Sequence, residues 1–230
     1  MSDTYELKTI ARIRSDFPTK FGIPRQAGIV EELEADIIFE PEYRDPEALR
    51  GLEGFSHIWL IWQFSQAVRE GFSPTVRPPR LGGNERMGVF ATRSPFRPNA
   101  LGLSCVKLCS IRTDPVLGSV LRVKGADLMD GTPIYDIKPY VPYADMRPEA
   151  LSGFAPDSGA TLHVTFAPGT EEKVSAGKLP ALRGVLANDP RPRYQTDKER
   201  VYAMEFADME IKFCVDNGEL TVISAERLKT

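Results

Sequence analysis

The sequence predicts a mainly β protein, with an all-β barrel or sandwich followed by a small α+β domain. Up to residue 145, short segments rich in β-branched and aromatic residues recur at nearly regular intervals, and almost no long helical pattern interrupts them. Residues 146–159 then shift to a proline-, glycine- and serine-rich composition that is typical of a linker. We therefore expect two domains, residues 1–150 and residues 156–230.

The most apolar stretch of the first domain, residues 55–64, predicts a buried central strand because it is short and rich in aromatic and β-branched residues. His57 lies within this stretch, where a histidine is more often a structural residue with its hydrogen bonds satisfied than a catalytic one. A short helix is expected where Asp45-Pro46 opens residues 45–52. The other expected strands are residues 7–14, 27–32, 35–39, 88–92, 101–111, 116–123 and 133–140.

In the second domain, one helix and a small sheet are expected. The helix covers residues 171–186, where apolar residues recur at helical spacing. The last two strands are joined by Asp216-Asn217-Gly218, a tight-hairpin signal. The expected strands are residues 161–166, 201–206, 210–215 and 220–224.

Composition excludes several classes of protein. The net charge of −3 means that any contact with nucleic acid must come from a local basic patch. Three cysteines without a C-x-x-C pair and two distant histidines make a zinc site unexpected, and we expect no metal. No Walker or G-x-G-x-x-G motif fits its required context. Neither a membrane-spanning run nor a signal peptide is present, which predicts a cytoplasmic protein with no membrane partner.

Residues 76–104 form the most basic part of the chain. Between Arg77 and Arg97 there are five arginines and a single acid, Glu85, on loops rich in proline and glycine. Prolines stiffen such loops, and the planar guanidinium group suits phosphate and carboxylate. This stretch is a candidate anion-binding face; the alternative is a solvated loop with unrelated arginines.

Residues 125–145 contain a second group of polar side chains. Asp127 and Asp130 lie at a turn, and Asp136, Lys138 and Tyr140 alternate along the next expected strand. Because side chains two residues apart share one face of a strand, this face presents a carboxylate, an ammonium group and a phenol together. The spacing fits no calcium loop. The alternatives are a functional face and ordinary solvent-facing turn residues.

At these residues the chain resembles a known family, the β-barrel tRNA N6-methyltransferases of the TrmO (YaeB-like) type. The resemblance extends in order over nearly the whole chain. It is carried by residues 20–26 (KFGIPRQ), 51–57 (GLEGFSH), 76–83 (VRPPRLGG), 88–99 (GVFATRSPFRPN), 127–133 (DLMDGTP), 136–140 (DIKPY) and 189–192 (DPRP).

The resemblance implies an antiparallel or mixed β-barrel that binds S-adenosylmethionine, with a C-terminal domain that contacts tRNA. It implies methylation of N6 of threonylcarbamoyladenosine, next to the anticodon, and it makes a homodimer plausible. By matching motif, it places cofactor contacts on Pro24, Arg25, Gln26, Ser65, Gln66, Arg93, Leu103, Asp127, Leu128, Met129 and Asp130. The family often has histidine where this chain has Ser65, so only a backbone contact is expected there.

The chemistry of the implied reaction suggests roles for the other polar residues. The acylated N6–H must lose its proton, and we hypothesise that Asp136, or Tyr140 helped by Lys138, assists. Arg93 or Arg97 could hold the threonyl carboxylate in a bidentate manner. The expected substrate or tRNA contacts are Arg77, Arg80, Arg86, Arg97, Asn99, Arg191 and Arg193. Two alternatives are a non-catalytic RNA-binding barrel and a methyltransferase that acts on a small molecule.

Overall fold

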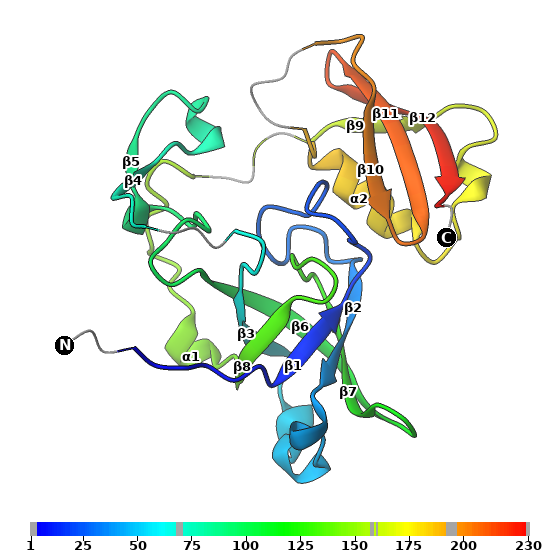
Figure 1. Cartoon of the computed structure of the whole chain (residues 1–230). Coiled ribbons are helices and arrows are strands. Elements are labelled where there is room, and N and C mark those ends of the chain that lie inside the picture. The colour runs from blue at the N-terminus through cyan, green and yellow to red at the C-terminus, as the bar shows by residue number, and fades with distance from the viewer. Residues whose placement is uncertain (1–3, 68–70, 157–158, 160, 192–196, 229–230) are drawn as a thin grey trace.

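The computed structural model describes residues 4–67, 71–156, 159, 161–191 and 197–228. Six strands close into a barrel in the order β1-β2-β7-β6-β3-β8, which confirms the predicted mainly β class (Figure 1). All neighbouring strands in it are antiparallel. The strands are β1 (Ala11–Arg14), β2 (Glu34–Phe39), β3 (His57–Gln63), β6 (Leu101–Asp114), β7 (Gly118–Lys124) and β8 (Pro133–Pro139).

Inward-facing side chains alternate with outward-facing ones along the barrel strands, as a pleated strand requires. In β3, Ile58, Leu60 and Trp62 are buried, whereas the residues between them are half-buried. These side chains join one hydrophobic cluster with buried residues of the other barrel strands. The apolar stretch around residue 60 is thus a central barrel strand, as predicted.

Short elements connect the barrel strands. Strands β4 (Thr75–Val76) and β5 (Met87–Gly88) pair in a hairpin that projects from one side of the barrel in Figure 1. Single 3₁₀ turns and one short helix complete this half of the chain: η1 (Pro41–Tyr43), η2 (Pro46–Leu49), η3 (Leu52–Gly54), η4 (Pro79–Leu81), η5 (Val89–Ala91) and α1 (Pro142–Asp145).

The C-terminal part is a four-stranded sheet with one helix, in agreement with the α+β prediction. The sheet order is β10-β11-β12-β9, and β9 runs parallel to β12. Asn217 and Gly218 both have positive φ between β11 and β12, as a two-residue hairpin turn requires. The elements are β9 (His163–Phe166), η6 (Glu171–Lys173), α2 (Leu179–Ala187), β10 (Tyr202–Phe206), β11 (Met209–Asp216) and β12 (Glu219–Arg227).

Four sequence predictions of individual elements are wrong. Residues 27–32 form turns, because Gly28 has φ +78° and the residues after it pack on the C-terminal sheet. The helix expected at residues 45–52 is only the 3₁₀ turn η2, ended before Gly51 at φ +88°. Residues 171–186 do not form one helix, since η6 ends at Lys173 and α2 starts at Leu179. The strand expected at residues 88–92 ends at Gly88.

The loop between β1 and β2 belongs to the core of the C-terminal sheet. Phe17, Val30 and Leu33 are buried in the hydrophobic cluster whose other members are Val174 and residues of α2 and the sheet. Both Asp16 carboxylate oxygens accept hydrogen bonds from Lys178, at 2.6 and 2.7 Å. The loop therefore connects the barrel to the C-terminal domain through apolar packing and an ion pair.

No helix among the described residues is long and apolar enough to cross a membrane. The three cysteines, all within the described residues, are free thiols. No cluster of three histidine, cysteine or acidic side chains in the described part of the chain is arranged to hold a metal ion.

Candidate active site and nucleic-acid interface

A cavity of about 980 Å³ lies at one end of the barrel. Because neighbouring strands are antiparallel, the ends of β1, β3 and β7 and the start of β6 meet at this end. The loops that follow or precede these strands form its walls. The lining residues are Pro24–Gln26, Trp59, Trp62, Phe64, Ser73, Thr75–Arg80, Thr92–Arg97, Leu101–Leu103, Asp127 and Phe154. We call it the barrel cavity.

Asp127 places a carboxylate in the wall of the barrel cavity. Its Oδ1 accepts a hydrogen bond of 2.6 Å from Ser104 Oγ, which in turn accepts one of 3.0 Å from the indole N–H of Trp62. Ser104 and Trp62 are buried, so their positions are fixed by barrel packing. Burial raises the pKa of Asp127, while the Ser104 hydrogen bond and the nearby Arg93 charge act in the opposite direction.

Gln26 and Arg93 meet across the same cavity. Arg93 donates a hydrogen bond to the Gln26 side-chain oxygen, and the Gln26 amide donates to the Arg25 carbonyl. These contacts join the loop after β1 to the loop before β6, which lie 67 positions apart. A guanidinium, an amide and a carboxylate thus line the wall of this cavity together with Trp59 and Trp62 of β3. Such a wall suits a ligand with hydroxyl, charged and aromatic parts.

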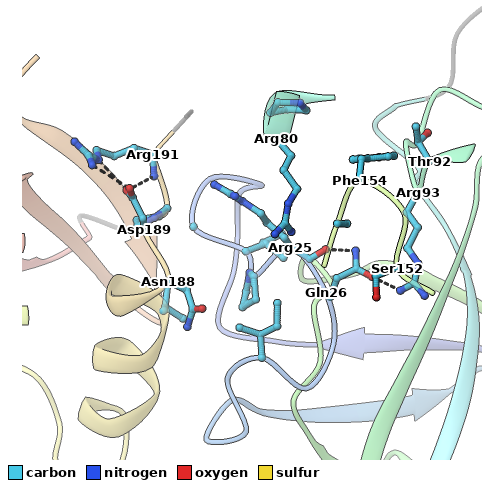
Figure 2. Close-up of a pocket in the computed structure, with 18 of the residues that line it drawn as sticks. Arg25, Gln26, Arg80, Thr92, Arg93, Ser152, Phe154, Asn188, Asp189 and Arg191 are labelled. Atoms are coloured by element: carbon cyan, nitrogen blue, oxygen red, sulfur yellow. Dashed lines mark hydrogen bonds and ion pairs between the residues drawn. The ribbon is translucent and has the colours of Figure 1, made fainter. Parts of the chain in front are cut away.

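A second cavity, of about 940 Å³, lies between the barrel loops and the C-terminal domain, and we call it the interdomain cavity (Figure 2). Pro24–Gln26, Arg80 and Arg93 line both cavities. The other lining residues include Phe90, residues 151, 152, 154 and 155, and the residues after α2, where Arg191 pairs with Asp189. Asp189 has φ +49°, which turns the chain sharply at the end of α2.

The structure brings together six of the eleven residues predicted to contact the cofactor. Pro24, Arg25, Gln26, Arg93, Leu103 and Asp127 all line the barrel cavity. The other five, Ser65, Gln66, Leu128, Met129 and Asp130, line neither cavity.

For two of these five residues, the structure shows a structural role instead. Leu128 is buried in the barrel core. The Asp130 carboxylate accepts a hydrogen bond of 3.0 Å from the Ser15 N–H, which fastens the turn before β8 to the end of β1.

Asp136, Lys138 and Tyr140 share one face at the end of β8, as the alternation predicts, but they do not line either cavity. Lys138 forms an ion pair of 3.0 Å with Asp136. The Tyr140 ring lies 5.8 Å from the ring of Trp59, which lines the barrel cavity. This group therefore lies next to the cavity, with Tyr140 beside Trp59.

The predicted substrate and tRNA contacts fall into different settings. Arg77 and Arg80 line the barrel cavity, whereas Arg86 and Asn99 are exposed outside it. Arg97 lines it too, and its guanidinium donates to the carbonyl oxygens of Thr92 and Val89. Arg191 is engaged with Asp189 at the interdomain cavity, and Arg193 lies outside the described residues.

Sequence reasoning missed Ser104, Trp62 and Phe154 as parts of the site. A serine inside an apolar strand carries no local signal, and its role emerges only from the hydrogen bonds to Trp62 and Asp127. Phe154 lies in the segment interpreted as a linker, yet it lines both cavities. An aromatic side chain in a proline- and glycine-rich stretch is the one sequence signal that could have indicated a role for Phe154 in the site.

Comparison with known proteins gives consistent matches along the chain. The model of the tRNA-methyltransferase O N-terminal domain matches residues 12–146, and that of the TrmO C-terminal domain matches residues 159–228. The chain is 40% identical to a tRNA (adenine(37)-N6)-methyltransferase of Escherichia coli K12, over 97% of this chain and 98% of that protein. It is 38% identical to a putative S-adenosylmethionine-dependent methyltransferase, RcsF, of Pseudomonas aeruginosa, over 90% of this chain and 91% of that protein.

A solved structure of TrmO from P. aeruginosa superposes on this fold with a TM-score of 0.81, at 31% identity, covering 99% of each chain. Both the sequence matches and the structural match include the barrel and the C-terminal domain. This chain belongs to the tRNA-methyltransferase O (TrmO) family.

Proposed function

We propose that this protein transfers a methyl group from S-adenosylmethionine to N6 of adenosine 37 in tRNA, with the threonylcarbamoyl derivative as the modified form. Family membership supports the reaction, since relatives named for this activity cover nearly the whole chain. The observation that carries the site assignment is the barrel cavity, where six of the residues that the family resemblance implies as cofactor contacts converge. The small-molecule alternative leaves the basic loops and the C-terminal domain unexplained.

The residues of the barrel cavity fit the proposed cofactor. When bound, S-adenosylmethionine supplies an electrophilic methyl group on a sulfonium. The Asp127 carboxylate, aligned by Ser104, can accept hydrogen bonds from ribose hydroxyls or from an ammonium group. Trp62 and Phe64, whose ring centroids are 4.2 Å apart, offer an apolar wall to a purine or a methylene chain. Positioning dominates the rate of such an in-line displacement.

For the substrate, the arginines on the rim offer two kinds of contact. Arg93 is better placed than Arg97 to hold the threonyl carboxylate, because Arg97 donates to two backbone carbonyls whereas Arg93 donates to one side chain, that of Gln26. Arg77, Arg80 and Arg86 are assigned to tRNA phosphates. Contacts of this kind fix the position of a nucleic acid on the protein. The C-terminal domain extends this surface. A homodimer and a cytoplasmic location belong to the same proposal.

The activity is tested with purified protein, S-adenosylmethionine and threonylcarbamoyl-containing tRNA from cells that lack the methyltransferase. Mass spectrometry of the digested tRNA should show a methylated threonylcarbamoyladenosine. No product on any tRNA, together with saturable tRNA binding, would favour the non-catalytic module instead.

The proton acceptor is tested by two variants on the β8 face. Asp136→Asn or Tyr140→Phe should slow methylation roughly 100-fold or more if the altered group takes the N6 proton. Cofactor affinity, measured by calorimetry, should stay nearly unchanged. Loss of affinity would reassign the residue to cofactor binding, and a rate within a few-fold of wild type in both variants would remove this face from the mechanism.

A further inference from the structure

The interdomain cavity has about the same volume as the barrel cavity, and the proposed cofactor site does not account for it. Its walls come from three parts of the chain: the barrel loops, residues 151–155, and the end of α2. Pro24–Gln26 and Arg93 separate it from the barrel cavity and line both. A ligand in the interdomain cavity would therefore lie next to whatever occupies the proposed cofactor site.

The charge of this cavity favours an anionic ligand. Arg25, Arg80, Arg93 and Arg191 line it, and Asp189 is the single acid among its described lining residues. The Asp189 carboxylate is already held by Arg191, through hydrogen bonds of 2.8 and 2.9 Å. In Figure 2 the Arg80 side chain reaches from η4 toward Arg25. Guanidinium groups form strong, charge-assisted hydrogen bonds with phosphate and carboxylate groups.

The apolar part of the cavity is aromatic and exposed. Phe90 lines the cavity and is 71% exposed. Two neighbours support its ring: the Phe72 ring, nearly parallel to it with centroids 6.4 Å apart, and the Arg97 guanidinium, 5.9 Å from its centroid. Phe154, from the segment after α1, lines the same cavity. A supported, exposed ring next to arginines is typical of a surface on which nucleic-acid bases stack.

We propose that the interdomain cavity receives one unpaired nucleotide of the tRNA loop, with its base on Phe90 and its phosphate at Arg25 and Arg80. The proposal rests on the proposed function, since it names a substrate contact of that enzyme. An unpaired loop nucleotide combines a planar base and a phosphate within one residue, which matches the aromatic and basic walls of this cavity. The C-terminal domain then contributes to tRNA binding by closing the cavity.

The base contact is tested with Phe90→Ala and the matched control Tyr143→Ala. Tyr143 is another exposed aromatic residue, 91% accessible, and it lines neither cavity. Loss of stacking should raise the Kd for threonylcarbamoyl-containing tRNA, and its KM in methylation, by roughly 5- to 100-fold. The Kd for S-adenosylmethionine should stay within about two-fold, and the control should match wild type. Thermal melting checks that both variants are folded.

The phosphate contact is tested with Arg80→Ala and the control Arg50→Ala. Arg50 lies on the exposed surface next to Glu47 and lines neither cavity. Removing one phosphate contact should lower the slope of log Kd for tRNA against log salt by about one, with no change for the control.

Three results would overturn the proposal: unchanged tRNA affinity in Phe90→Ala, equal losses in Phe90→Ala and Tyr143→Ala, or weakened cofactor binding with normal tRNA binding. Failure of the proposed function has a different signature, because wild-type protein would then give no methylated tRNA whatever the variants do. If wild type methylates tRNA and the Phe90 and Arg80 variants behave like wild type, only the cavity assignment is wrong.

Discussion

The Asp127 carboxylate is held where opposing effects act on its pKa. Burial raises this pKa above its usual value, and the hydrogen bond from Ser104 offsets part of the rise. Because the folded chain binds this proton more tightly than the unfolded chain does, ionisation of Asp127 lowers stability. The free energy of unfolding therefore falls as pH rises through the window between the unfolded and the folded pKa.

Asp127→Asn should raise the free energy of unfolding at neutral pH, on the order of 0.5–1 kcal/mol. The amide oxygen can still accept the Ser104 hydrogen bond, and the buried charge is gone. The same variant should weaken S-adenosylmethionine binding about ten-fold or more, through loss of a charge-assisted hydrogen bond.

Urea unfolding at pH 4 and pH 7.5, with calorimetric titration of the cofactor, measures both effects. The stability difference between variant and wild type should shrink at the lower pH, because a larger share of Asp127 is protonated there and its raised pKa then costs less stability. A variant that is less stable at neutral pH and still binds cofactor normally would contradict this account of Asp127.

At the scale of elements, the β1–β2 loop connects barrel stability to the site. Gly22 has φ +95°, and a Cβ at this position would lie 2.8 Å from Met204 Cε in β10. Pro24–Gln26 follow directly in the wall of both cavities. The path of the loop over the C-terminal sheet therefore decides where these site residues lie.

Gly22→Ala should destabilise the protein by about 1–3 kcal/mol and weaken cofactor binding, because the new methyl group strains the backbone and displaces Met204. Gly28→Ala is the matched control: its φ is +78°, but a Cβ there has no atom within 4 Å outside its chain neighbours. Chemical denaturation and cofactor titration of both variants separate strain from collision. Equal effects in the two would show that the Met204 contact is unimportant.

At the scale of the whole molecule, the C-terminal domain is incomplete without the N-terminal loop. Phe17, Val30 and Leu33 are each no more than 3% exposed in the C-terminal core, and each buried side chain contributes roughly 1.5–3 kcal/mol. That sum is comparable with the total stability of a small domain.

The isolated fragment 156–230 should therefore be unfolded or only marginally stable, whereas the full chain should unfold cooperatively. Near-UV circular dichroism and urea titration of the fragment and of the full chain provide the measurement. A fragment as stable as the same region in the full chain would show that the loop adds little.

Much of the fold could be predicted because it depends on local patterns. Alternation and β-branched content located most of the strands, and Asn217-Gly218 located a hairpin. The failed elements have tertiary causes. Residues 27–32 have strand-like composition, but their apolar side chains pack on a helix and a sheet that come more than 130 positions later, which no local pattern encodes. In residues 171–186, apolar spacing was visible and the break between η6 and α2 was not.

For the site, the sequence by itself determined which residue types are available: an arginine-rich, proline-stiffened stretch and the motifs that mark the TrmO family. Only the tertiary structure decided which of them meet. Barrel closure brings Gln26, Arg93 and Asp127 into one cavity, and burial of Ser104 and Trp62 aligns the carboxylate. The tertiary structure also directs the Asp130 carboxylate to the Ser15 N–H, and it forms the interdomain cavity. The physical reason is that these contacts depend on strand register and domain packing, which arise from the whole chain at once.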